Sequence, residues 1–171
     1  AGCDAVGENY VQEIVAKLDG RRPPLPLHMI GSIQSNKVRK IDRVVSLWES
    51  VDRTSVIEEI GRRAGSGGCA DVLIQVNVTG EESKGGCAPG DLEGLLASAG
   101  DAGVRVLGLM GIGPTDGARA DTEKAFRGLR GLCDENSLAV CSMGMSGDYE
   151  IAVACGSTMV RLGSVLFGAR G

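Results

Sequence analysis

The sequence predicts an α/β fold in which parallel strands alternate with helices. Short apolar runs of strand length recur along the chain, and the segments between them carry apolar residues at helical spacing. The clearest strand, residues 71–78, is almost continuously apolar, as expected for a strand covered on both faces of a parallel sheet. A length of 171 residues is typical of one domain. We therefore expect residues 1–171 to form a single α/β domain.

Strands are expected at regular intervals. Residues 1–6 have the character of the end of a strand, and six complete strands are expected near residues 26, 45, 73, 105, 139 and 159. The last two take in the segments 137–142 and 157–161.

Helices are expected between the strands. The first spans residues 8–18, where Val11, Ile14 and Leu18 share one face, and the Pro23-Pro24 pair prevents it from continuing. The others are expected over 34–42, after Thr54, around 92–99, over 118–133, over 148–155 and from Val165 onward.

The stretch from Cys141 to Arg170 contains the best candidate for a binding site. Two loops rich in small residues, 142–147 and 161–164, each follow a strand. Hydroxyl groups, uncovered backbone amides and a permanent cation together suit a phosphate. The residues that supply them are Ser142, Ser146, Ser157, Thr158, Gly144, Gly147, Gly163 and Arg161. The alternative is that Gly and Ser only form turns here.

Composition argues against several classes of protein. The chain carries 18 Lys and Arg against 22 Asp and Glu, a net charge of -4, and has no basic run typical of nucleic-acid binding. No apolar run approaches the roughly 20 residues that span a bilayer, and the N-terminus does not have the pattern of a signal peptide. Six cysteines without a C-x-x-C pair, beside one histidine, indicate neither zinc nor a disulfide framework. We expect a cytoplasmic protein that binds neither nucleic acid nor membrane.

A series of motifs along the whole chain resembles the pyridoxal phosphate homeostasis protein family. They are G-E-N-Y-V-Q-E at 7–13, H-M-I-G-S-I-Q-S-N-K at 28–37, S-V-D-R at 50–53, L-I-Q-V-N-V at 73–78, G-E-E-S-K-G-G at 80–86 and G-L-M-G-I at 108–112. The carboxyl-terminal patterns S-M-G-M-S-x-D-x-E, G-S-T-x-V-R-x-G and F-G-x-R complete the series.

The resemblance implies a fold and a function. Periodicity alone does not separate a barrel from an open sheet, but the family implies a TIM-type (β/α)8 barrel like the N-terminal domain of alanine racemase, a pyridoxal phosphate (PLP) fold of type III. It also implies a protein, monomeric and not itself catalytic, that binds, buffers and delivers PLP, with PLP-dependent apoenzymes as partners. One alternative is a racemase-like enzyme, which would need a second base, generally from a further β domain and a partner subunit. Another is a phosphate-binding barrel without pyridoxal chemistry.

The start of the chain departs from the family pattern. Family members carry an N-terminal helix and a first strand that ends in the lysine forming a Schiff base with PLP. None of the five lysines corresponds to it: Lys17, Lys37, Lys40, Lys84 and Lys124. We expect a fragment without those elements, an incomplete barrel with an exposed sheet edge, and non-covalent PLP binding. The other interpretation is a genuinely short protein.

The resemblance also implies roles for individual residues. Arg161 would face the pyridine nitrogen, and Asn9 would point toward the cofactor from the end of a strand. Phosphate ligands would be the amides of Gly163 and Ser164 with hydroxyls of Ser142, Ser146, Ser157 and Thr158. Met145, with Met143, would flank the ring, although Met more often fills a core.

Three further positions carry weaker hypotheses. His28 is a candidate general base or, equally, a core histidine, since the sequence identifies no acidic partner for it. The Gln34, Asn36 and Lys37 motif could hold a second phosphate, contact a partner or simply begin a solvated helix. Lys84, in a Gly-rich loop, could react reversibly with an aldehyde or be solvated.

Overall fold

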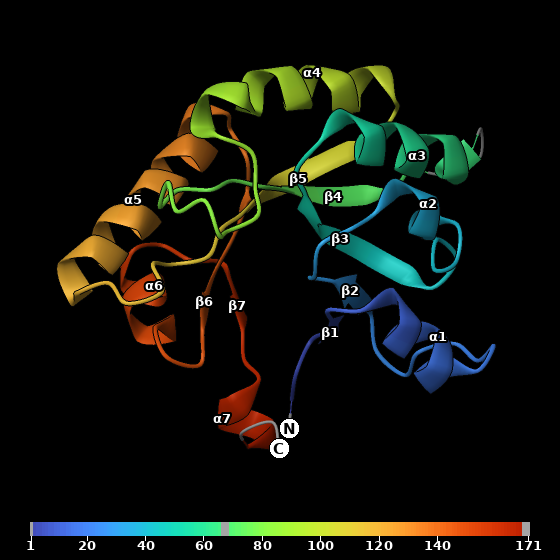
Figure 1. The fold of residues 1–171 in the computed structure, drawn as a ribbon, viewed down its shortest axis with the longest axis horizontal. Helices are drawn as coiled ribbons and strands as arrows, with labels where there is room; N and C mark the ends of the chain where they lie inside the picture. Colours follow the sequence, from blue (N-terminus) through green and yellow to red (C-terminus); the bar gives the residue numbers. More distant parts are fainter. Residues whose placement is uncertain (1, 66–68, 169–171) are drawn as a thin grey trace.

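The computed structural model describes residues 2–65 and 69–168, which form a nearly closed barrel of parallel strands surrounded by helices (Figure 1). Seven strands pair in sequence order, each parallel to the next. They are β1 (Val6–Glu8), β2 (Leu27–Met29), β3 (Val45–Val51), β4 (Asp71–Gln75), β5 (Arg105–Met110), β6 (Val140–Met145) and β7 (Met159–Arg161). The incomplete barrel expected from the sequence is confirmed.

Helices follow the strands in strict alternation. They are α1 (Val11–Leu18), α2 (Ser35–Val38), α3 (Thr54–Ala64), α4 (Leu92–Asp101), α5 (Arg119–Glu135), α6 (Tyr149–Ala154) and α7 (Ser164–Phe167), with a short 3-10 turn at Pro89–Asp91. Figure 1 shows them on the outside of the sheet. Within the described ranges, none has the length and apolar character of a membrane span.

Alternation along the strands divides the apolar side chains into two clusters. On β3, Trp48 and Val51 join the larger cluster between the sheet and the helices. Leu47 instead joins Leu73, Met110 and their neighbours in a smaller cluster inside the barrel. The interior is therefore packed with side chains, as in other small parallel barrels.

Two glycines set how closely β6 packs. A Cβ on Gly108 would lie 1.8 Å from the Val140 carbonyl oxygen, so no other residue allows β5 and β6 to pair at this distance. Gly144 has a φ of 95°, and its Cβ would lie 2.5 Å from the Cβ of Ala152 in α6. This backbone produces the irregular pairing of β6 with β7 between Ser142 and Met145.

The order of the elements was predicted well, whereas several boundaries were not. β6 runs to Met145, so Ser142 lies inside a strand and not in a loop. β7 begins at Met159 and not at residue 157, β1 covers 6–8 and not the residues before it, and α7 begins at Ser164. The end of the F-G-x-R motif lies outside the described residues.

Candidate functional site

The carboxyl ends of the parallel strands all meet at one mouth of the barrel, where sites of such folds are built. Just beneath this mouth, polar side chains replace the apolar interior. Glu49, Gln75 and Ser142 are all buried, at 1%, 7% and 0% exposure, and they come from β3, β4 and β6. His28 from β2 and Arg161 from β7 join Glu49 and Ser142 through hydrogen bonds.

Arg161, Ser142, Glu49 and His28 form a continuous hydrogen-bonded chain across the barrel. Arg161 Nη1 donates to Ser142 Oγ at 2.7 Å, and Ser142 Oγ donates to Glu49 Oε2 at 2.7 Å. Glu49 Oε1 lies 2.7 Å from His28 Nδ1. We name these residues the interior relay.

The direction of each bond in the interior relay follows from the number of protons available. Ser142 has one hydroxyl proton, and because the Arg161 guanidinium can only donate, that proton goes to Glu49. An ionised Glu49 accepts from both sides, which assigns the proton on His28 to Nδ1. The relay therefore contains a cation at the β7 end and an anion in the middle.

Arg161 is held by two bonds. Besides Ser142, its Nη2 donates to the Gly111 carbonyl at 2.9 Å. Burial lowers the pKa of Arg161 from its usual range, while the negative charges of Glu49 and Asp148 act in the opposite direction. Because an arginine titrates so far above neutrality, it remains a cation here.

Ser146 and Gly163 meet at the mouth, at the carboxyl ends of β6 and β7. The amides of Gly163 and Val165 donate to Ser146 Oγ at 3.2 and 3.3 Å. A Cβ on Gly163 or Gly147 would meet no atom within 4 Å, so the backbone here faces open space. Two amides and a hydroxyl beside open space can accept an anionic group.

The other predicted mouth residues fall near this region. Ser164 is exposed and begins α7, while Met145 ends β6 with 41% exposure. Asn9 follows β1 and is partly exposed. Its backbone packs closely against Gly31, because a Cβ on Gly31 would lie 2.0 Å from the Asn9 carbonyl oxygen.

Ser157 and Thr158 lie at the opposite end of the barrel from Gly163. Both precede β7, so they lie at its amino end. Ser157 Oγ donates to main-chain carbonyls, with Met143 at 2.8 Å, and Thr158 Oγ1 accepts from the Cys141 amide at 2.8 Å. These hydroxyls support β6, and the structure does not bring them to the mouth. Met143, fully buried in the outer core, does not face the mouth either.

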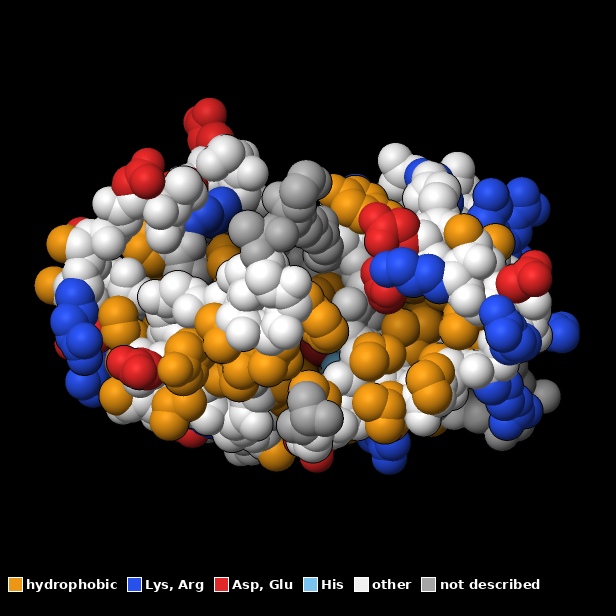
Figure 2. Space-filling view, turned by 90° about the horizontal axis from the view of Figure 1, so that it is seen from below, with side chains coloured by type: hydrophobic (Ala, Val, Ile, Leu, Met, Phe, Trp, Pro, Cys, Tyr) orange, Lys and Arg blue, Asp and Glu red, His pale blue; other side chains and the backbone are white. Residues whose placement is uncertain are grey.

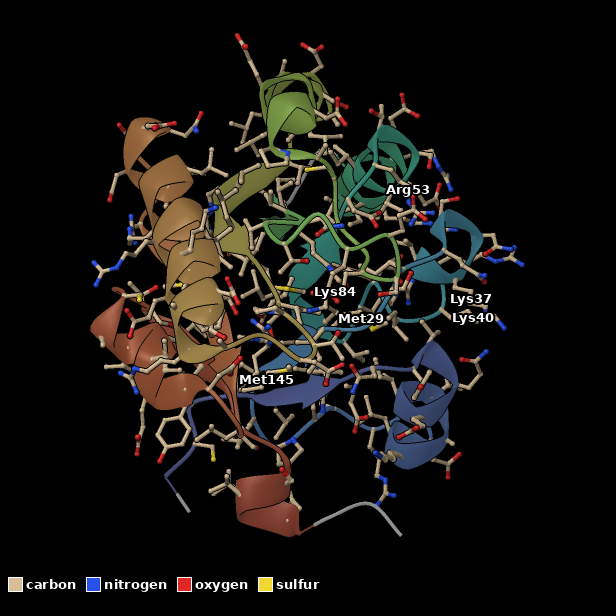
Figure 3. The ribbon with its side chains drawn as sticks, turned by 60° about the vertical axis from the view of Figure 1, so that its left-hand side comes forward. Met29, Lys37, Lys40, Arg53, Lys84 and Met145 are labelled. Atoms are coloured by element: carbon tan, nitrogen blue, oxygen red, sulfur yellow. The ribbon has the colours of Figure 1, made fainter. Side chains whose placement is uncertain are left out.

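Lys84 was expected either to react with an aldehyde or to be solvated, and the structure shows that it is not solvated. Its side chain is only 11% exposed and forms an ion pair with Glu81 at 3.0 Å, and it also donates to the Gly113 carbonyl. Figure 3 shows Lys84 and Met145 toward the middle of the molecule, whereas Lys37 on α2 and Lys40 just after it lie at the outer edge.

The Gln34 to Lys37 motif lies on the outside of the barrel. Asn36 lines a groove of about 530 Å³ between α2 and α3, together with Arg39 and Arg62. Helix side chains form this groove, not strand ends, so we place the site at the mouth and not here.

Sequence reasoning missed Glu49, and so it did not find the acidic partner of His28. The signal was a charged residue in the apolar run of β3, because a carboxylate buried among apolar residues needs a partner. Gln75 was missed for the same reason; its Nε2 donates to the Gly85 carbonyl at 2.8 Å and ties the Gly-rich loop to β4.

Comparison with known proteins agrees with this geometry. The family model described as alanine racemase, N-terminal domain, matches residues 1–171. Alanine racemase from Clostridium difficile has a TM-score of 0.78 at 16% identity, covering 98% of this chain and 45% of that one, which shows the fold alone.

Two other proteins are much more similar. PipY of Synechococcus elongatus, in a structure with PLP bound, has a TM-score of 0.84 and 34% identity, covering 98% of this chain and 82% of that one. The pyridoxal phosphate homeostasis protein of Aquifex aeolicus is 42% identical over 178 residues, which are 99% of this chain and 78% of the relative. The chain belongs to the pyridoxal phosphate homeostasis protein family, on the barrel of the alanine racemase N-terminal domain.

Proposed function

We propose that this chain binds pyridoxal 5′-phosphate at the mouth of the barrel and contributes to its intracellular homeostasis, without catalysing a reaction. The observation that carries the proposal is the pairing of a fixed cation, Arg161, with the open cradle of Ser146 and Gly163. Relatives of the same family are named for PLP homeostasis, and PipY has been solved with PLP bound.

The residues present fit the two ends of PLP. The Ser146 hydroxyl and the amides of Gly163, Ser164 and Val165 would hold the phosphate. Arg161 would face the pyridine nitrogen, and an arginine keeps that nitrogen unprotonated. Met145 and Asn9 would lie beside the ring. When bound, the cofactor supplies a reactive aldehyde and a pyridine ring that acts as an electron sink, and an arginine beside the ring nitrogen would weaken that sink.

We propose that binding is non-covalent in this chain. Lys84 is engaged by Glu81 and Gly113, and Lys17 on α1 pairs with Glu8 and Glu13. Lys124 is exposed on α5, an outer helix.

Delivery to PLP-dependent apoenzymes in the cytoplasm, by a monomer, completes the proposal. Residues 37–43 carry four cations, Lys37, Arg39, Lys40 and Arg43, and none forms an ion pair with a described residue. This cluster is a candidate contact for an acidic surface of a recipient enzyme.

The first test is a titration of the purified chain with PLP, followed by absorbance, then borohydride reduction and peptide mass mapping. We expect saturable binding that inorganic phosphate competes for, much weaker binding of pyridoxal, and no reduced adduct on a lysine. An adduct trapped on one lysine would contradict non-covalent binding. Binding of phosphate and PLP with equal affinity would favour a phosphate site without pyridoxal recognition.

A racemisation assay separates the carrier from the enzyme. We expect no interconversion of L- and D-alanine in the presence of saturating PLP. Turnover above that of free PLP would contradict the non-catalytic role.

A further inference from the structure

The buried carboxylate of Glu49 requires an explanation beyond packing. Glu49 is 1% exposed, and an isolated carboxylate in such a place is strongly unfavourable unless charges and hydrogen bonds compensate it. Its two oxygens are both used, one by Ser142 and one by His28. The structure therefore places a fully hydrogen-bonded carboxyl group immediately behind the mouth.

Glu49 acts on Arg161 through Ser142. Ser142 Oγ lies 2.7 Å from both Arg161 Nη1 and Glu49 Oε2. Because Ser142 gives its proton to Glu49, its oxygen lone pairs are turned toward Arg161, and the charge of Glu49 polarises the hydroxyl in that direction. Among the charged groups near Arg161, Glu49 is the strongest in opposing the effect of burial.

We propose that Glu49 is a positioning residue for Arg161: through Ser142 it fixes the guanidinium group at the mouth in the orientation that receives the pyridine ring. His28, bonded to the other oxygen of Glu49, holds the carboxylate in turn. This inference rests on the proposed function, because its ligand is PLP. It assigns a binding role to residues that do not touch the ligand.

A purely structural role predicts something different. The interior relay joins β2, β3, β6 and β7, so it could serve only to hold the strands together. In that case, removing it would lower the melting temperature of the protein, while the affinity of the folded protein and the spectrum of bound PLP would not change.

The experiment compares PLP affinity and the absorbance spectrum of bound PLP in five proteins: wild type, Ser142→Ala, Glu49→Gln, Arg161→Lys and the double variant Glu49→Gln with Arg161→Lys. Thr122→Val is the control, because Thr122 is also a buried hydroxyl but donates to a local group, the carbonyl of Ala118 just before α5. Ser142→Ala removes only a hydroxyl group. If Glu49→Gln does not fold, the PLP affinity and spectrum of Ser142→Ala are the test of the interior relay.

We expect Ser142→Ala and Glu49→Gln to weaken PLP binding at least about tenfold, as for the loss of a hydrogen bond to a charged group, and to shift the spectrum of bound PLP. In the Arg161→Lys background, Glu49→Gln should cause little further loss, because its effect passes through the guanidinium. Thr122→Val should match wild type.

Three other outcomes are distinguishable. If wild type binds PLP and folded Ser142→Ala has the same affinity and spectrum, the positioning role is wrong and the proposed function stands. If the effect of Glu49→Gln is equally large with lysine at position 161, Glu49 does not act through the guanidinium. If wild type itself does not bind PLP, the proposed function fails, and this inference fails with it.

Discussion

At the scale of single residues, the cations of the barrel have two kinds of surroundings. Arg161 is held from both sides, by Gly111 and by Ser142, and has an anion behind it. Lys37 and Lys40, by contrast, form no ion pair with described residues and project from the outer surface. A cation that is held in place recognises a ligand with little loss of conformational freedom, whereas free surface cations attract partners over a longer range.

Arg161→Lys is expected to weaken PLP binding by about tenfold or more. A lysine keeps the charge but presents it as a point, so it cannot reproduce the planar arrangement of donors toward Gly111, Ser142 and the ligand. An absorbance titration measures the dissociation constant. Lys40→Arg, on the outer surface, is the control and should leave the constant unchanged. Equal affinity in Arg161→Lys would mean that charge alone is recognised.

The sequence could identify some of these residues and not others. Arg161 ends a strand, Ser146 and Gly163 follow strands, and all three carry anion-binding groups, so local pattern was enough to make them candidates. Glu49 stood out only as a charged residue in an apolar run, and its pairing with Ser142 could not be predicted because the two residues are 93 apart along the chain. Ser157 and Thr158 were assigned to the phosphate through the family resemblance, whereas both precede β7 and so lie at its amino end, away from the mouth.

At the scale of elements, the Gly-rich loop between β4 and α4 is tied down more firmly than its composition suggests. Gln75 holds the Gly85 carbonyl, Asn77 Nδ2 donates to the Glu81 carbonyl at 2.9 Å, and Lys84 is engaged by Glu81. Thr115 Oγ1 donates to Glu81 Oε2 at 2.9 Å, so the loop is also joined to the segment after β5. Composition alone indicated only a Gly-rich loop, because these contacts depend on the tertiary fold.

The loop is expected to loosen in acid. Hydrogen bonds from Lys84 first, and from Thr115 second, lower the pKa of Glu81 below its ordinary value of about 4.5. A lowered pKa in the folded state means that the stabilisation is present above the ordinary value and is lost as pH falls through the lower one. NMR relaxation should show greater motion of residues 79–88 at about pH 3 than at about pH 6. Glu81→Gln should show that motion at both pH values, whereas Glu82→Gln, at the exposed neighbour, should behave as wild type.

The packing of β5 against β6 leads to a prediction about two glycines. Gly108→Ala should lower the free energy of unfolding by about 2 kcal/mol or more, because the new methyl group would overlap the Val140 carbonyl. Gly128→Ala, on α5 where a Cβ meets nothing, should instead raise it by about 0.5–1 kcal/mol through improved helix propensity. Urea denaturation measures both. An unchanged free energy of unfolding in Gly108→Ala would mean that β5 and β6 can move apart without destabilising the fold.

At the scale of the whole molecule, the sheet has two edges. β1 and β7 are the ends of the strand order, so within the described residues each has one unpaired side. The exposed apolar residues of α7 follow β7 directly: Val165 at 58%, Leu166 at 43% and Phe167 at 84%. Figure 2, which views the molecule from below, shows apolar side chains gathered across that face. An unpaired edge beside exposed apolar groups favours self-association at high concentration.

Phe167→Ser should therefore reduce light scattering of concentrated protein without lowering its melting temperature, because the side chain contributes little to the core. Val153→Ser, a change at another exposed residue, is the control and should have a smaller effect, because Val153 is the one exposed large apolar side chain among the described residues of α6, whereas α7 exposes three. Equal improvement in both variants would indicate general surface hydrophobicity and not the edge.

The order of the strands also bears on how the chain reaches this structure. Because each strand pairs with the next one in sequence, the sheet can be extended one strand and one helix at a time from either end. Contacts between distant parts of a chain slow folding, and this order keeps sequence separation small for a parallel sheet. During synthesis the amino-terminal strands can therefore pair before β7 has left the ribosome. The interior relay, which joins β7 to β3, would then be among the last interactions to form, so the capacity to recognise a ligand would appear only when the fold is nearly complete.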